Sequence, residues 1–76
     1  MRVHFVAEYD GGVRTSVCAE EMADVPAAYR RAEALLRGRP LAHRIEAWDG
    51  GQYVTRATRG VEVVEGAQVA LGEVGE

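Results

Sequence analysis

The sequence predicts a small two-layer α+β domain, with elements in the order β-β-α-β-β and one helix packed on one face of an antiparallel sheet. Three observations lead to this prediction. An aromatic residue followed by Asp-Gly-Gly occurs at residues 9–12 and again at 48–51, and these glycines supply the positive φ that tight hairpin turns require. Alternating apolar residues, typical of half-buried strands, flank both copies. Between the copies, residues 25–37 carry apolar side chains at helical spacing.

The first hairpin is expected to have a three-residue turn at residues 10–12. This turn length keeps the apolar residues of both strands on one face and sets Glu8 opposite Arg14, an attractive pair. The same register places His4 opposite Cys18 on the polar face. A histidine beside a thiol can lower the thiol pKa and create a nucleophile. An ordinary exposed cross-strand pair is the alternative, and we favour it.

The helix is expected to cover residues 25–37. Asp24 is placed to cap its N-terminus, and Pro26 is tolerated in the first turn because the N–H groups there have no helical partner. Gly38 and Pro40 predict the end of the helix. The apolar stripe of this segment is therefore expected to pack on the sheet.

The second hairpin is expected to join strands at residues 41–48 and 52–59. Ile45 and Ala47 are predicted to face the helix, with Trp48 on the other face of the sheet. No turn length gives pairings as clean as those of the first hairpin, so the register of this hairpin stays open.

The C-terminal residues show a shorter pattern. Residues 61–71 are compatible with a third hairpin or a final edge strand, and the single domain is expected to span residues 1–71. Residues 72–76 are expected to form a frayed acidic tail.

Size and composition limit the functional classes. A chain of 76 residues forms one domain with a small core. Its apolar runs are too short to span a bilayer, and no signal-peptide pattern is visible. The single cysteine cannot form an internal disulfide, so a reducing, cytoplasmic setting is expected. Since the chain starts at Met1 and contains no linker, we expect a complete reading frame.

Nothing in the sequence indicates catalysis, a cofactor or a metal site. The glycine pairs lack the spacing of phosphate-binding loops. A metal site needs three or four ligands, whereas Cys18 is the only cysteine and His43 is remote from His4 in the sequence. A domain built around one helix is also expected to leave no room for a pocket. The sequence therefore predicts a protein that is not an enzyme.

Charged residues are unevenly distributed along a chain whose net charge is −3. The C-terminal segment is acidic and lacks basic residues, whereas arginines crowd the middle. Two aromatic residues flank the second turn and are candidate anchors for a partner. The candidate partner-binding residues are Glu62, Glu65, Glu73, Trp48 and Tyr53, and the candidate nucleic-acid-binding residues are Arg30, Arg31, Arg37, Arg39 and Arg44.

In size, acidity and expected architecture the chain resembles the small inhibitors encoded by phages and mobile elements, anti-CRISPR proteins among them. The resemblance implies binding to a larger protein or ribonucleoprotein complex and obstruction of its surface, including a site where nucleic acid would bind. Carboxylates can compete electrostatically with phosphates for a basic cleft. A homodimer is compatible with the exposed strand edges. The alternative is a small nucleic-acid-binding regulator or antitoxin-like protein that uses its arginine cluster.

Overall fold

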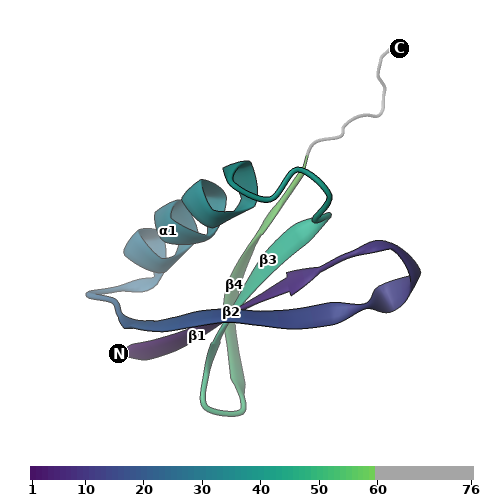
Figure 1. Cartoon of the computed structure of the whole chain (residues 1–76). Coiled ribbons are helices and arrows are strands. Elements are labelled where there is room, and N and C mark those ends of the chain that lie inside the picture. Colours follow the sequence, from purple (N-terminus) through teal and green to yellow (C-terminus); the bar gives the residue numbers. More distant parts are fainter. Residues whose placement is uncertain (60–76) are drawn as a thin grey trace.

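The computed structural model describes residues 1–59 and confirms the predicted α+β class and the β-β-α-β-β order. The expected elements within residues 61–71 and the tail at 72–76 lie outside the described residues. Four antiparallel strands form one sheet in the order β2-β1-β3-β4, and one helix covers one of its faces (Figure 1). The elements are β1 (Arg2–Glu8), the short 3-10 turn η1 (Asp10–Gly12), β2 (Arg14–Glu21), α1 (Val25–Arg37), β3 (Arg44–Asp49) and β4 (Gln52–Thr58).

The β1–β2 hairpin has the predicted turn and, near it, the predicted register. Gly11 and Gly12 have φ values of 76° and 77°. Residues with a Cβ rarely adopt this left-handed region. Glu8 pairs with Arg14, as expected.

Further from the turn, a β-bulge shifts this register by one residue. The bulge leaves Val17 without a partner on β1, so Phe5 pairs with Cys18 and His4 with Ala19. The predicted pairing of His4 with Cys18 is therefore wrong. The physical reason is that a bulge sets two residues of one strand against one of the other, which moves the following side chains to the opposite face.

Helix α1 has the predicted bounds and the predicted cap. The Asp24 carboxylate accepts a hydrogen bond of 2.9 Å from the backbone N–H of Ala27, satisfying one of the helix's otherwise unpaired donors. The helix ends at Arg37, followed by Gly38 as the C-cap. Its buried side chains are Ala28, Ala32, Leu35 and Leu36.

The β3–β4 hairpin differs from the prediction at its start and contains a second bulge. Strand β3 begins at Arg44 rather than at residue 41, because residues 38–43 follow the helix with turn hydrogen bonds such as that from the Ala42 N–H to the Arg39 carbonyl, 2.9 Å. Next to the turn, Asp49 pairs with Gln52 and Trp48 with Tyr53, and a register shift between Ala47 and Trp48 then pairs Ala47 with Thr55. The structure thus settles the register that the sequence left open.

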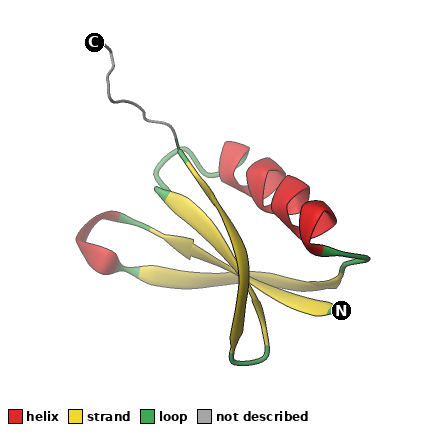
Figure 2. Ribbon diagram, turned by 180° about the vertical axis from the view of Figure 1, so that it is seen from behind, coloured by secondary structure: helices red, strands yellow, loops and turns green. Residues whose placement is uncertain are grey.

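The core lies between α1 and the inner face of the sheet. Val3, Phe5 and Ile45 are its largest fully buried side chains, and the predicted inward position of Ala47 is confirmed. Fully burying an aliphatic or Phe side chain contributes roughly 1.5–3 kcal/mol. The helix packs mainly on β3 and β4, and the β1–β2 turn extends beyond the helix (Figure 2). No helix in residues 1–59 is long and apolar enough to cross a membrane.

Candidate binding face

The side of the sheet opposite α1 is the candidate site, and we call it the outer face. Since side chains alternate along a strand, the buried residues on one side define the members on the other. Among residues 1–59, no helix or strand covers this face (Figures 1 and 2). Strands β1, β3 and β4 contribute Arg2, His4, Val6 and Glu8 from β1, Arg44, Glu46 and Trp48 from β3, and Tyr53 and Arg56 from β4.

Trp48 and Tyr53 form an aromatic pair on the outer face, beside the β3–β4 turn. Their ring centroids are 5.6 Å apart and their planes meet at 77°, an edge-to-face arrangement that the ring quadrupoles favour. The Trp48 Nε1–H donates to a Glu46 carboxylate oxygen at 3.2 Å. Tyr53 is 48% exposed. On the other side of Trp48, His4 is its register partner on β1. The two aromatic residues proposed from the sequence therefore belong to one cluster.

Ion pairs lie next to this cluster on the outer face. The Arg14 guanidinium reaches across β1 to the Glu46 carboxylate. Further along the strands, the Nε of Arg44 lies 2.6 Å from a carboxylate oxygen of Glu8. Such pairs contribute little to stability when exposed, but they hold the charged side chains in place around the aromatic pair.

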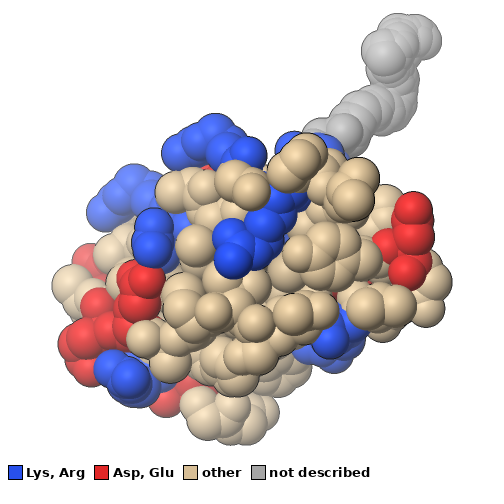
Figure 3. Space-filling view, in the orientation of Figure 1, with Lys and Arg blue, Asp and Glu red and all other residues tan. Residues whose placement is uncertain are grey.

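The structure separates the predicted arginine cluster into three groups. Arg30 and Arg37 are exposed on α1, and Arg39 follows the helix end. Arg31 is bonded to Glu20, and Arg44 lies on the outer face. Figure 3 shows basic side chains gathered over the helix and the segment after it. The first group has no ion-pair partner within residues 1–59 and is the candidate for anion binding; we call Arg30, Arg37 and Arg39 the helix arginines.

Arg59 has a structural role that the sequence did not reveal. Its guanidinium donates to the carbonyl oxygens of Ala42 at 3.0 Å, Leu36 at 2.8 Å and Arg39 at 2.9 Å. The last carbonyls of a helix lack helical partners, and a cation at this end is also favoured by the helix dipole. No sequence signal identifies Arg59, because the contact joins residues about twenty positions apart.

Cys18 and His4 do not form a reactive pair. Cys18 lies on the inner side of β2, where partial burial raises the pKa of its thiol above the ordinary value of 9.0, aided by a hydrogen bond to the Glu20 carboxylate. His4 instead bonds the Ser16 hydroxyl on the outer side of the hairpin. Within residues 1–59, no three His, Cys, Asp or Glu side chains are grouped to hold a metal ion.

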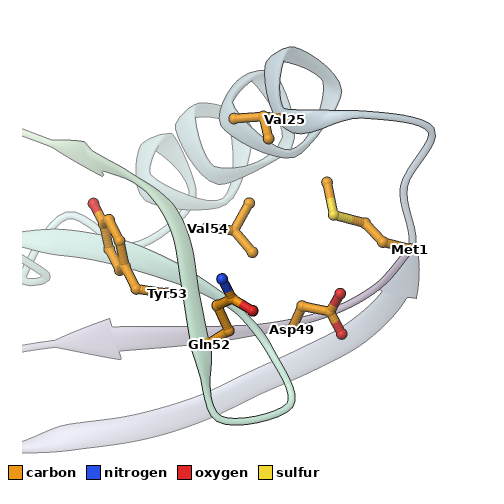
Figure 4. Close-up of a pocket in the computed structure, with 6 residues that line it drawn as sticks. All are labelled: Met1, Val25, Asp49, Gln52, Tyr53 and Val54. Carbon is orange, nitrogen blue, oxygen red and sulfur yellow. The ribbon is translucent and has the colours of Figure 1, made fainter.

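A pocket exists where none was expected. A hollow of about 280 Å³, open to solvent, lies between the start of β1, the first turn of α1 and the β3–β4 turn (Figure 4). It is lined by Met1, Val25, Asp49, Gln52, Tyr53 and Val54. The expectation failed because the start of α1 at Val25 and the β3–β4 turn at Asp49 and Gln52 border one hollow at this end of the core without filling it.

Three predicted contact residues, Glu62, Glu65 and Glu73, lie outside the described residues. No family model, curated protein or solved structure matches the chain.

Proposed function

We propose that this protein is a non-catalytic binding module that docks its outer face on a larger protein and obstructs the surface it covers. The observation that carries the proposal is the Trp48–Tyr53 pair on a sheet face that no described element covers. Trp and Tyr are enriched among the residues that contribute most to protein–protein binding.

The surroundings of the pair support a protein partner. Protein interfaces place aromatic residues at the centre and polar residues around them. Here the ion pair of Arg14 with Glu46 and the exposed His4 border the aromatic pair. Because Arg14 and Glu46 are already paired with each other, docking over the aromatic pair does not bury either of these two charges without a partner, which would be costly.

The obstruction part of the proposal comes from the charge distribution along the sequence. All nine arginines lie in residues 1–59, whereas residues 60–76 contain four glutamates and no basic residue. In the proposal, Glu62, Glu65 and Glu73 contact a basic surface of the partner, where they compete with nucleic acid. A ribonucleoprotein complex offers such a surface.

The proposal is tested with Trp48→Ala and Tyr53→Ala. Tagged wild-type protein and both variants are used to capture partners from a bacterial lysate, and the captured proteins are compared by quantitative mass spectrometry. With the purified partner, each substitution is expected to weaken binding about 30-fold, the equivalent of 2 kcal/mol. The fluorescence of Trp48, the only tryptophan, reports binding by the wild type directly.

The matched control is Tyr29→Ala, because Tyr29 is a comparably exposed aromatic residue on the helix face, 40% exposed. It is expected to leave partner binding unchanged. Equal loss in Tyr29→Ala and Tyr53→Ala, or full binding by Trp48→Ala, would show that the outer face is not the docking surface.

A second candidate function is nucleic-acid binding through the helix arginines. Arg30 and Arg37 are exposed and have no ion-pair partner among the residues that the structure describes. Binding of this kind falls steeply as salt rises. Arg30→Glu with Arg37→Glu should abolish binding to labelled single-stranded or duplex DNA at low salt, whereas Arg44→Glu on the outer face should not. No binding by the wild type at low salt would remove this candidate.

A further inference from the structure

The pocket lies next to the aromatic pair and has a distinct composition. In Figure 4, Val25, Val54, Gln52 and Asp49 surround one space, with the Met1 side chain at its edge, whereas the Tyr53 ring stands on the other side of the β4 ribbon. Tyr53 therefore belongs to the pocket rim and to the outer face at once. A partner that covers Trp48 and Tyr53 would reach the pocket by passing over the edge of β4.

The pocket combines apolar walls with one charged group. Val25, Val54 and Met1 supply the apolar surface, and Asp49 is the only charged side chain in the lining. Nearby carboxylates already have partners, since Asp24 caps α1 and Glu21 lies 2.8 Å from the N-terminal ammonium. Within residues 1–59, the Asp49 side chain makes no hydrogen bond or ion pair, so its carboxylate is available to a ligand.

Asp49 and Gln52 are cross-strand partners at the β3–β4 turn. Their side chains thus place a carboxylate and an amide oxygen side by side at one wall. A guanidinium is planar and presents its N–H donors as a fork that matches such paired acceptors. Its three-carbon stem can lie against apolar surface while the charged head stays at the polar wall.

We infer that this pocket receives an arginine side chain of the partner protein, with its guanidinium on Asp49 and Gln52 and its stem against Val25 and Val54. The inference rests on the proposed function and names the chemistry of the partner's contact. An anionic group is disfavoured by the Asp49 carboxylate. A purely apolar group would strip water from that carboxylate without replacing its hydrogen bonds. Lysine offers a point charge rather than a fork.

The test is an NMR titration of the whole chain with N-acetyl-arginine amide. The probe is expected to bind weakly, with a dissociation constant in the millimolar range. It should shift the backbone signals of Asp49 and Gln52 and the methyl signals of Val25 and Val54. The citrulline analogue, which is neutral but of similar shape, should shift them much less.

The variant for this test is Asp49→Asn, because asparagine suits turns as well as aspartate does and the hairpin is expected to be retained. It should weaken arginine-probe binding about tenfold, the usual effect of losing a charge-assisted contact. Equal shifts from the citrulline or lysine analogue, or no shift up to the solubility limit of the probe, would overturn the inference.

Capture of the partner by Trp48→Ala and by Asp49→Asn distinguishes failure of this inference from failure of the proposed function. If Trp48→Ala abolishes capture of the partner and Asp49→Asn leaves it unchanged, the docking face stands and the arginine pocket fails. If both substitutions weaken capture, both are supported. If Trp48→Ala leaves capture unchanged, the proposed function fails, and the probe titration alone decides whether the pocket binds arginine.

Discussion

The Glu20 carboxylate accepts two hydrogen bonds from the Arg31 guanidinium, each 2.9 Å long, and so joins the edge strand β2 to helix α1. The helix packs mainly on β3 and β4, and most of β2 is exposed or only half-buried. A bidentate pair restrains the two elements in orientation as well as in distance. This contact is therefore expected to influence how firmly β2 is held beside the helix-covered core.

Glu20→Gln should reduce stability at neutral pH but not in acid. The hydrogen bonds from Arg31 lower the pKa of Glu20 below its ordinary value of 4.5. A carboxylate whose pKa is lowered by folding stabilises the fold above its unfolded pKa, and this contribution is lost as the pH falls through the folded pKa. Urea denaturation at pH 7 and pH 3 should thus show a difference between wild type and variant only at pH 7. Glu33→Gln, which removes a half-buried carboxylate from α1, is the matched control; an equal pH-dependent difference in it would contradict the assignment to Glu20.

Arg59→Met should destabilise the domain. The substitution removes three donors from carbonyl oxygens at the end of α1 and in the following turn while keeping a long apolar side chain. Loss of a hydrogen bond to a charged group costs roughly 1.5–3 kcal/mol, and each kcal/mol lowers the melting temperature of a domain this small by about 4–8 °C. Thermal unfolding followed by circular dichroism measures the change. Arg56→Met, on the outer face of β4, should stay within about 0.5 kcal/mol of wild type.

Cys18 should react slowly with alkylating reagents at neutral pH. Burial raises the pKa of its thiol, and the Glu20 carboxylate raises it further, so less of the nucleophilic thiolate is present than in a free cysteine. Reaction with iodoacetamide should be slower than that of a cysteine in a short peptide and should accelerate in Glu20→Gln. A native reaction rate above that of the peptide would revive a role for Cys18 as a nucleophile.

Ala32→Leu should destabilise the domain through crowding. Ala32 is fully buried where α1 faces the sheet, beside a core that includes the equally buried Ala47 and Ala28. Extra methylene groups in a packed core cost typically about 1–3 kcal/mol. The midpoint of urea denaturation reports the loss. Ala34→Leu, at a half-buried position of the same helix, should cost much less; equal losses would show that the helix face near Ala32 is not closely packed.

Local chemistry explains why much of the fold could be predicted. Asp24 caps the helix through a contact within its own first turn, whatever the helix packs against. Gly11 and Gly12 adopt positive φ because they lack a Cβ. The alternation of Val3, Phe5 and Ala7 identifies the buried face of β1 without knowledge of its neighbours. These features depend on residues close together in the sequence.

The sites were harder to predict because they depend on pairing between distant segments. One bulged residue, Val17, separated His4 from Cys18 and moved Cys18 to the inner side of β2, beside Phe5. A bulge adds one residue to one strand only, and the alternation of side chains within that strand does not reveal it. The position of Trp48 on the outer face was predicted. Its pairing with Tyr53 was not, because the bulge between Ala47 and Trp48 prevents any single turn length from giving one continuous register.

By itself, the sequence determined the class of the fold, the position of the helix and the buried faces of β1 and β3, because capping, turn conformation and periodicity act within a few residues. Only the tertiary structure decided that Arg31 and Arg59 serve the fold, that Trp48 meets Tyr53, and that a pocket opens beside Asp49. Those arrangements depend on strand register and helix placement, which are set by packing between segments far apart along the chain.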